Sequence, residues 1–242
     1  MKKSYDEVDF YNTPWTIIDI VGVFFILLIV SIGSLIFYIL IVRDQRIQFL
    51  LFSYTASILS FCIPFFWLKK KYNIDLGSLG MKKGKYHFLN QLLIATVIAS
   101  IMFGVAETLV PSIKKVEFIN KEFKTESFFA LFLVPFTLKG FARFILNPIG
   151  EELLFRGFLY GYLRKKLNIK FAIIFQAIIS TAWHLVYIKE AFASPSLFIQ
   201  VGYIALIFVV MAGIYEATKS LYPCIICHGM YNFLLLVYPI YT

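Results

Sequence analysis

The sequence predicts an all-α protein, a polytopic bundle of transmembrane helices that crosses the bilayer seven times, with eight spans as the alternative. Of its 242 residues, 60% are hydrophobic and 19% are aromatic, and the mean hydropathy is +0.79. Soluble domains do not have this composition. Several stretches without Asp, Glu, Lys or Arg are each long enough, at ~1.5 Å per helical residue, to cross a bilayer or nearly so. These stretches are Ile20–Val42, Ile47–Leu68, Phe88–Ala106, Phe171–Ile188, Ala191–Tyr215 and Ser220–Thr242.

The first two spans are expected at Trp15–Val42 and Ile47–Leu68. The segment before them lacks the pattern of a cleavable signal peptide, so the first span is expected to stay in the protein. The lysines Lys69–Lys71 should stop the second span at the membrane interface. The following segment, Asn73–Tyr86, mixes apolar residues with glycines and lysines, and it is expected to lie along the lipid headgroups.

The third span is expected at Phe88–Val110, and the segment Phe128–Leu146 after it is the least regular of the apolar runs. Lys139 and Arg143 lie four residues apart there, on one helical face, where lipid would not tolerate them without snorkelling or a polar cavity. Asn147 as N-cap and Pro148 in the first helical position then predict the start of a new helix. This helix and the later spans are expected at Pro148–Leu167, Phe171–Ile188, Ser196–Tyr215 and Pro223–Tyr241.

Basic residues predict the orientation of the bundle. The net charge is +9, and the positive residues form clusters beside apolar runs rather than a stripe suited to nucleic acid. If 128–167 crosses once, the amino-terminal side carries thirteen basic loop residues and the other side seven, so the amino terminus is expected in the cytoplasm. If it crosses twice, the bias disappears. We therefore expect seven spans, in a single integral membrane domain over 1–242 with its catalytic core at about 127–242.

Two adjacent carboxylates and an arginine interrupt the apolar sequence at Gly150–Gly157. At about 100° per residue, Glu152 and Arg156 share a helical face and are expected to pair, whereas Glu151 points about a quarter-turn away with no local counter-charge. Because charges in a membrane are costly, such residues usually mark function. Gly157 and Gly161 have the spacing that lets other membrane helices approach closely.

Three more polar residues lie within apolar runs. His184 lies in the fifth expected span, and His228 and Asn232 share one face of the last one. Together with Glu151 they suit hydrolysis, in which a carboxylate or imidazole activates water and an Asn or His donor stabilises the oxyanion. A zinc site formed by Glu151, His184 and His228 is an alternative, although the sequence has no paired H-x-x-x-H spacing.

The segment Cys224–His228 matches the pattern of c-type haem attachment. It is embedded in the start of an apolar helix, and no second axial ligand is obvious. We therefore disfavour a haem site.

The set Glu151-Glu152-x-x-x-Arg156, an intramembrane histidine, and His228-x-x-x-Asn232 resembles the CPBP family. This family comprises CAAX prenyl endopeptidases and bacteriocin-processing or immunity proteins, and it is also called the Abi family. The flanking residues are similar too, but Ser180 stands where the family usually has a phenylalanine, four residues before the histidine. The resemblance covers about the last hundred residues.

The resemblance implies a role for each site residue. Glu151 would be the base that activates water, His184 would help to hold that water, and His228 with Asn232 would stabilise the oxyanion. Glu152 and Arg156 would support the site. The family is often labelled metalloprotease, but a metal-free glutamate mechanism, which requires no cofactor, fits these residues equally well.

We therefore expect an intramembrane endopeptidase that acts on a peptide or protein substrate near the cytoplasmic face. Its role would be CAAX-type cleavage, processing of a bacteriocin or signal peptide, or self-immunity. The alternative is a non-catalytic bacteriocin immunity protein of the membrane, which binds a toxin or its receptor. A transporter is disfavoured because the sequence has no internal repeat. High Lys, Ile, Phe and Tyr usage is typical of an AT-rich bacterial genome, which favours peptide processing or immunity and a location in a bacterial cell membrane.

Overall fold

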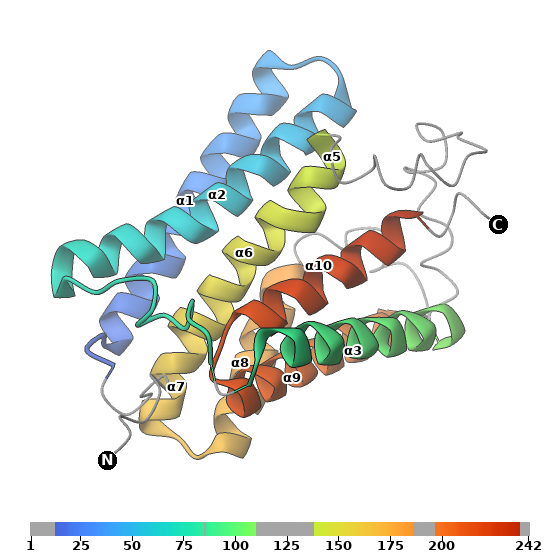
Figure 1. Cartoon of the computed structure of the whole chain (residues 1–242). Coiled ribbons are helices and arrows are strands. Elements are labelled where there is room, and N and C mark those ends of the chain that lie inside the picture. Colours follow the sequence, from blue (N-terminus) through green and yellow to red (C-terminus); the bar gives the residue numbers. More distant parts are fainter. Residues whose placement is uncertain (1–12, 85, 110–137, 186–196, 238–242) are drawn as a thin grey trace, which may run out of the picture.

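The computed structural model describes residues 13–84, 86–109, 138–185 and 197–237, and within these residues it contains helices and no strands (Figure 1). The first two helices, α1 (Ile17–Ile41) and α2 (Gln45–Tyr72), pack against each other. The third, α3 (Phe88–Leu109), packs along the last, α10 (Tyr222–Val237). Two further helices, α8 (Ile169–Leu185) and α9 (Leu197–Thr218), form another pair. The predicted all-α fold is therefore confirmed for the described residues.

A central helix runs between these pairs. It consists of five successive segments that keep helical backbone angles at their junctions. They are α5 (Leu138–Phe141), η4 (Ala142–Leu146), α6 (Asn147–Glu152), η5 (Leu153–Tyr160) and α7 (Gly161–Lys166). The η segments are π-helical, with turns wider than those of an α-helix. α2 and α10 flank α6, while α8 packs on η5.

Asn147 does not begin a helix, so the predicted N-cap is wrong. Its φ of −60° and ψ of −51° are helical, and the chain continues through Pro148 without a break. Proline lacks the N–H that would bond the carbonyl four residues earlier, here that of Phe144. Membrane helices tolerate proline where local π turns and neighbouring helices compensate, and η4 supplies such a turn immediately before Pro148.

Among the described residues, four helices are long and apolar enough, by length and composition, to cross a bilayer. They are Ile17–Ile41, Leu51–Tyr72, Phe88–Ala106 and Leu197–Thr218. A shorter apolar helix covers Ile169–Leu185. The chain is therefore an integral membrane protein, and the count of seven or eight spans stays a prediction.

A buried carboxylate joins the start of α1 to the end of α2. Asp19 is fully buried and caps its own helix by accepting hydrogen bonds from Thr16. It also accepts hydrogen bonds from Trp67, Lys71 and Tyr72 of α2, at 2.9, 2.6 and 2.7 Å. These contacts satisfy a charge that would otherwise be costly to bury, and they fix the two helices relative to each other.

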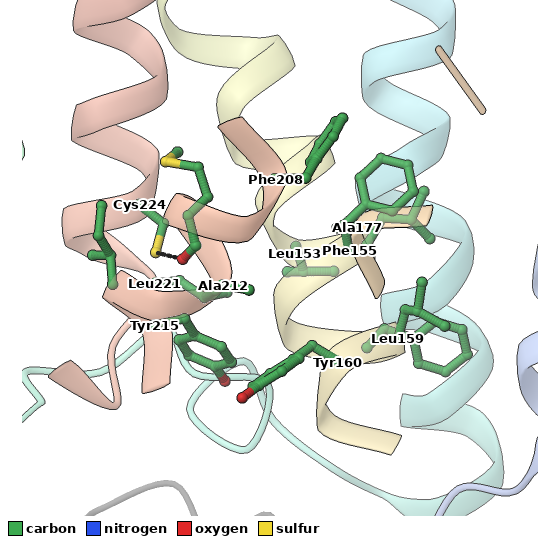
Figure 2. Packing of buried hydrophobic residues seen from close by; sticks show 14 of the residues in the cluster. Leu153, Phe155, Leu159, Tyr160, Ala177, Phe208, Ala212, Tyr215, Leu221 and Cys224 are labelled. Atoms are coloured by element: carbon green, nitrogen blue, oxygen red, sulfur yellow. Dashed lines mark hydrogen bonds between the residues drawn. The ribbon is translucent and has the colours of Figure 1, made fainter. Parts of the chain in front are cut away.

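The densest hydrophobic packing surrounds η5, whose eight residues are all buried. Figure 2 shows Phe155, Leu159 and Tyr160 in this core, with the rings of Tyr160 and Tyr215 side by side; the ring centroids are 6.0 Å apart. Phe155 also contacts the ring of Phe208 from α9, at a centroid distance of 5.8 Å. The central helix is thus held firmly just beyond Glu152.

The described part of the segment between α2 and α3 packs against the protein, and its position along the lipid headgroups stays a prediction. Leu79 is fully buried. Gly80 has a φ of +98°, which favours glycine, and its carbonyl oxygen accepts a hydrogen bond from the N–H of Leu221 at 2.8 Å. A Cβ on Gly157 would lie only 2.5 Å from the carbonyl oxygen of Leu79. Gly157 therefore allows the close approach of this loop segment, whereas the sequence predicted the approach of another helix.

Other glycines bring helices against the carboxylates. A Cβ on Gly150 would collide with the carbonyl oxygen of Ser57 in α2. A Cβ on Gly229 of α10 would lie 2.6 Å from the carbonyl oxygen of Phe144. Gly161, which was expected to admit a helix, instead faces the ring of Trp15. Close helix packing at the site therefore depends on Gly150 and Gly229.

Candidate active site

A cavity of about 460 Å³ lies beside the middle of the central helix, bounded by side chains of α2, α8, α9 and α10 among others. All six residues singled out from the sequence line it. They are Glu151, Glu152, Arg156, His184, His228 and Asn232. Residues from three separate apolar segments therefore converge, as the sequence suggested.

Glu151 is the meeting point of the two histidines. Its Oε2 lies 3.3 Å from Nε2 of His184 and 3.9 Å from Nε2 of His228. The side chains of Glu151, His184 and His228 are 23%, 25% and 16% exposed, so each reaches the cavity. Glu151, which has no counter-charge on its own helix, therefore has its partners on α8 and α10.

The other ring nitrogen of each histidine faces an oxygen atom. Nδ1 of His184 lies 2.8 Å from the carbonyl oxygen of Ser180, and Nδ1 of His228 lies 2.9 Å from Oε1 of Glu152. A carbonyl or carboxylate oxygen only accepts, so we assign the hydrogen to Nδ1 in both rings. In their neutral forms both histidines then direct a lone pair on Nε2 towards Glu151, an arrangement suited to hold a donor such as water.

The departure from the family pattern at Ser180 does not disturb this arrangement, because His184 uses the backbone carbonyl of that residue. The Ser180 hydroxyl accepts a hydrogen bond from the amide of Gln176, at 2.7 Å. A buried polar pair therefore lies on the same helix, one and two turns before the histidine.

The ion pair between Glu152 and Arg156 is present, as the spacing predicted. Nη1 of Arg156 lies 3.0 Å from Oε1 of Glu152, and the two side chains are 1% and 0% exposed. The guanidinium also lies over the ring of Phe208, with Cζ 4.8 Å from its centroid. In the part of the chain that the structure describes, Glu152 Oε2 and Arg156 Nε and Nη2 have no hydrogen-bond partner.

Asn232 and Arg143 join α10 to the central helix. Nδ2 of Asn232 donates a hydrogen bond to the carbonyl oxygen of Arg143, at 3.0 Å. A carboxamide has two N–H groups, so this bond holds the side chain while leaving a second donor.

Sequence reasoning missed Asn147 and Ser57 as residues of the site. Both line the cavity, and the Ser57 hydroxyl hydrogen-bonds to Oδ1 of Asn147. Asn147 lies one turn before Glu151, and this four-residue spacing is a signal for a place in the site, although an asparagine directly before a proline also favours a helix cap. Arg143 lines the cavity as well, while the side chain of Lys139 lies outside the described residues.

A zinc site was the alternative for Glu151, His184 and His228. Among the described residues, no group of three or more His, Cys, Asp or Glu side chains is arranged to hold a metal ion. As they are placed here, these residues therefore do not fit a metal centre.

Residues 132–234 match the family model described as Type II CAAX prenyl endopeptidase Rce1-like. The Rce1-like match confirms the resemblance inferred from the motifs and covers every residue of the predicted site. It is a family of proteases, and at this level the chain is similar to a peptidase. Comparison with curated proteins and with solved structures gives no match.

Proposed function

We propose that this protein is an intramembrane endopeptidase in which Glu151 activates water to hydrolyse a peptide bond. The observation that carries the proposal is the position of Glu151 Oε2 opposite Nε2 of both His184 and His228, inside a cavity within the bundle. Water placed between the Glu151 carboxylate and Nε2 of His184 can donate a hydrogen bond to each of them, which orients its oxygen towards a bound substrate.

The proposed reaction conserves protons. Glu151 takes a proton from water, and the water oxygen forms a bond to the scissile carbonyl carbon while His184 holds the water in place. Asn232 and His228 donate to the oxyanion. His228 does so as an imidazolium, with Nδ1–H bonded to Glu152 and Nε2–H directed into the cavity. Glu151 then passes its proton to the leaving amine as the C–N bond breaks.

Glu152 and Arg156 are assigned a supporting role. Glu152 holds the ring of His228, and Arg156 holds Glu152. We further propose that the whole chain, 1–242, forms one membrane domain with its catalytic core at 127–242, and that α2 completes the cavity wall through Ser57.

The substrate is proposed to be a peptide or protein in the lipid bilayer, with no nucleic acid involved. The Rce1-like match favours a CAAX-type substrate. Processing of a bacteriocin or signal peptide, or self-immunity, would use the same site. A bacterial cell membrane with a cytoplasmic amino terminus remains our proposal for the location.

Cleavage in detergent tests the function. The probe is an S-farnesylated peptide ending in Cys-Ala-Ala-Met, incubated with wild type and with Glu151→Gln. The substitution keeps the volume and removes the base, so the rate should fall by roughly 10²–10⁴-fold while thermal unfolding is unchanged. Asp75→Asn, the same change at an exposed loop carboxylate, should cleave like wild type. Equal cleavage by wild type and Glu151→Gln would remove the central residue of the mechanism.

The non-catalytic immunity protein would behave differently. In a protection assay at normal expression, Glu151→Gln and His184→Ala should both abolish protection if proteolysis is responsible. Protection that persists in both variants would favour binding of a toxin or its receptor.

A further inference from the structure

Arg143 is a positively charged residue within the apolar bundle, and it has no role in the proposed mechanism. It belongs to η4 and lines the same cavity as Glu151. Within the described residues, no hydrogen bond or ion pair engages its guanidinium; the contact with Asn232 uses only its backbone carbonyl. An unpaired charge inside a membrane bundle is costly, and such residues usually face a ligand pathway.

The carboxylates that line the cavity are already engaged. Glu151 faces His184 and His228, and Glu152 is shared between Arg156 and His228. No carboxylate among the described cavity residues therefore neutralises Arg143. Its charge is available to an anion that arrives with a ligand.

The position of Arg143 sets the distance to such an anion. Arg143, Asn147 and Glu151 follow one another at intervals of four residues, and all three line the cavity. Eight helical residues correspond to about 12 Å along the axis. An extended peptide covers ~3.3–3.6 Å per residue, so a chain of about three or four residues spans this distance.

We propose that Arg143 is a specificity-determining residue, which binds the free α-carboxylate of the substrate and thereby positions the scissile bond at Glu151. This inference rests on the proposed endopeptidase function. A guanidinium suits the ligand, because its planar fork binds a carboxylate through two parallel hydrogen bonds. A lipid phosphate would offer related chemistry, but Arg143 shares its cavity with Glu151, which favours the substrate.

A binding experiment isolates this subsite from catalysis. The protein carries Glu151→Gln, to prevent turnover, with or without Arg143→Gln. The probes are the S-farnesylated Cys-Ala-Ala-Met peptide with a free carboxyl terminus and the same peptide with a terminal amide. With Arg143 present, the acid should bind at least about tenfold more tightly than the amide, and Arg143→Gln should remove this preference.

Two further variants sharpen the comparison. Arg143→Lys should keep part of the preference, because it retains a positive charge without the fork. Lys170→Gln removes a charge from an exposed position outside the cavity, and it should keep the full preference. Loss of the preference in Lys170→Gln would show that net charge, rather than Arg143, selects the acid, and would overturn the proposal.

The remaining outcomes separate the subsite from the function. Equal binding of acid and amide, or no binding of either, overturns the role of Arg143, even if wild type cleaves both peptides with Glu151 and the endopeptidase stands. Acid-selective binding without any cleavage would support the subsite while the proposed function fails. If native mass spectrometry finds that Arg143→Gln only loses a co-purifying anionic lipid, with the peptide preference unchanged, the ligand is a lipid phosphate and the proposal is overturned.

Discussion

Glu152 Oε1 lies 2.9 Å from Nδ1 of His228, so a fully buried carboxylate of the central helix holds the imidazole of another helix. The same oxygen lies 3.0 Å from Nη1 of Arg156. Glu152 therefore connects an element of the fold, the buried ion pair, to an element of the site, the ring of His228. Disrupting the ion pair and disrupting the orientation of His228 should have different signatures.

Removal of Arg156 should chiefly damage the fold. Arg156→Ala leaves the Glu152 carboxylate buried without its cation, and breaking a buried pair costs about 3–5 kcal/mol. The double variant Glu152→Gln/Arg156→Met should recover part of that stability, because no stranded charge remains. Thermal unfolding in detergent measures both. If Arg156→Ala were as stable as wild type while Glu151→Gln were not, the roles of the two glutamates would be reversed.

Glu152→Gln should lower both the stability and the rate, because it leaves the buried Arg156 cation without its carboxylate. The amide keeps the volume but loses the charge that holds Nδ1 of His228; orienting partners of histidines in metal sites contribute roughly 10–100-fold to activity, and we expect a loss of the same order here. We expect this loss in kcat, with KM close to that of wild type, for the farnesylated peptide. A change confined to KM would instead place Glu152 in substrate binding.

Gly150 should not tolerate even a methyl group. A Cβ there would collide with the backbone carbonyl of Ser57, so Gly150→Ala must push α2 away from α6 and should cost about 1–3 kcal/mol. Gly202→Ala in α9 is the matched control, since a Cβ there meets no described atom within 4 Å; it should be neutral or stabilising by up to ~1 kcal/mol. Similar unfolding temperatures for the two variants would contradict the close approach.

Activity should survive removal of metal ions. The proposed mechanism assigns activation of water to Glu151 itself, so exhaustive dialysis against a chelator should leave cleavage of the farnesylated peptide unchanged. Activity that disappears on chelation and returns with zinc would show that the glutamate mechanism is incomplete, and would restore the zinc alternative for Glu151, His184 and His228.

The sequence predicted the parts of the site that depend on local geometry or on unusual chemistry. Glu152 and Arg156 pair because four residues of helix bring them together. The convergence of Glu151, His184 and His228 could be predicted because ionisable side chains within a membrane usually face the interior of the bundle and pair with one another. Their exact partners, such as Glu152 at His228, come from contacts between helices and have no local signal.

The errors arose where tertiary structure overrides local preference. Asn147 and Pro148 look like a helix start, but packing against α2 and α10 and the wide turn of η4 carry the helix through them. Asp19 was unremarkable in the sequence because its partners Trp67, Lys71 and Tyr72 are about fifty residues away. Local patterns do not encode such distant pairings.

Arg143, Asn147 and Glu151 line the cavity at intervals of four residues. The wide turn of η4 also sets the direction in which Arg143 points around the helix axis relative to the other two. In an α-helix, side chains four residues apart drift by about 40° around the axis at each step, so Arg143 and Glu151 would differ by about 80°. A π turn contains more residues, and each of them rotates the chain less, which offsets the drift between Arg143 and Asn147. Deleting one residue between Arg143 and Asn147 would rotate Arg143 by roughly 100° relative to Glu151. The two side chains would then no longer face the same cavity, although the composition of the helix would be almost the same.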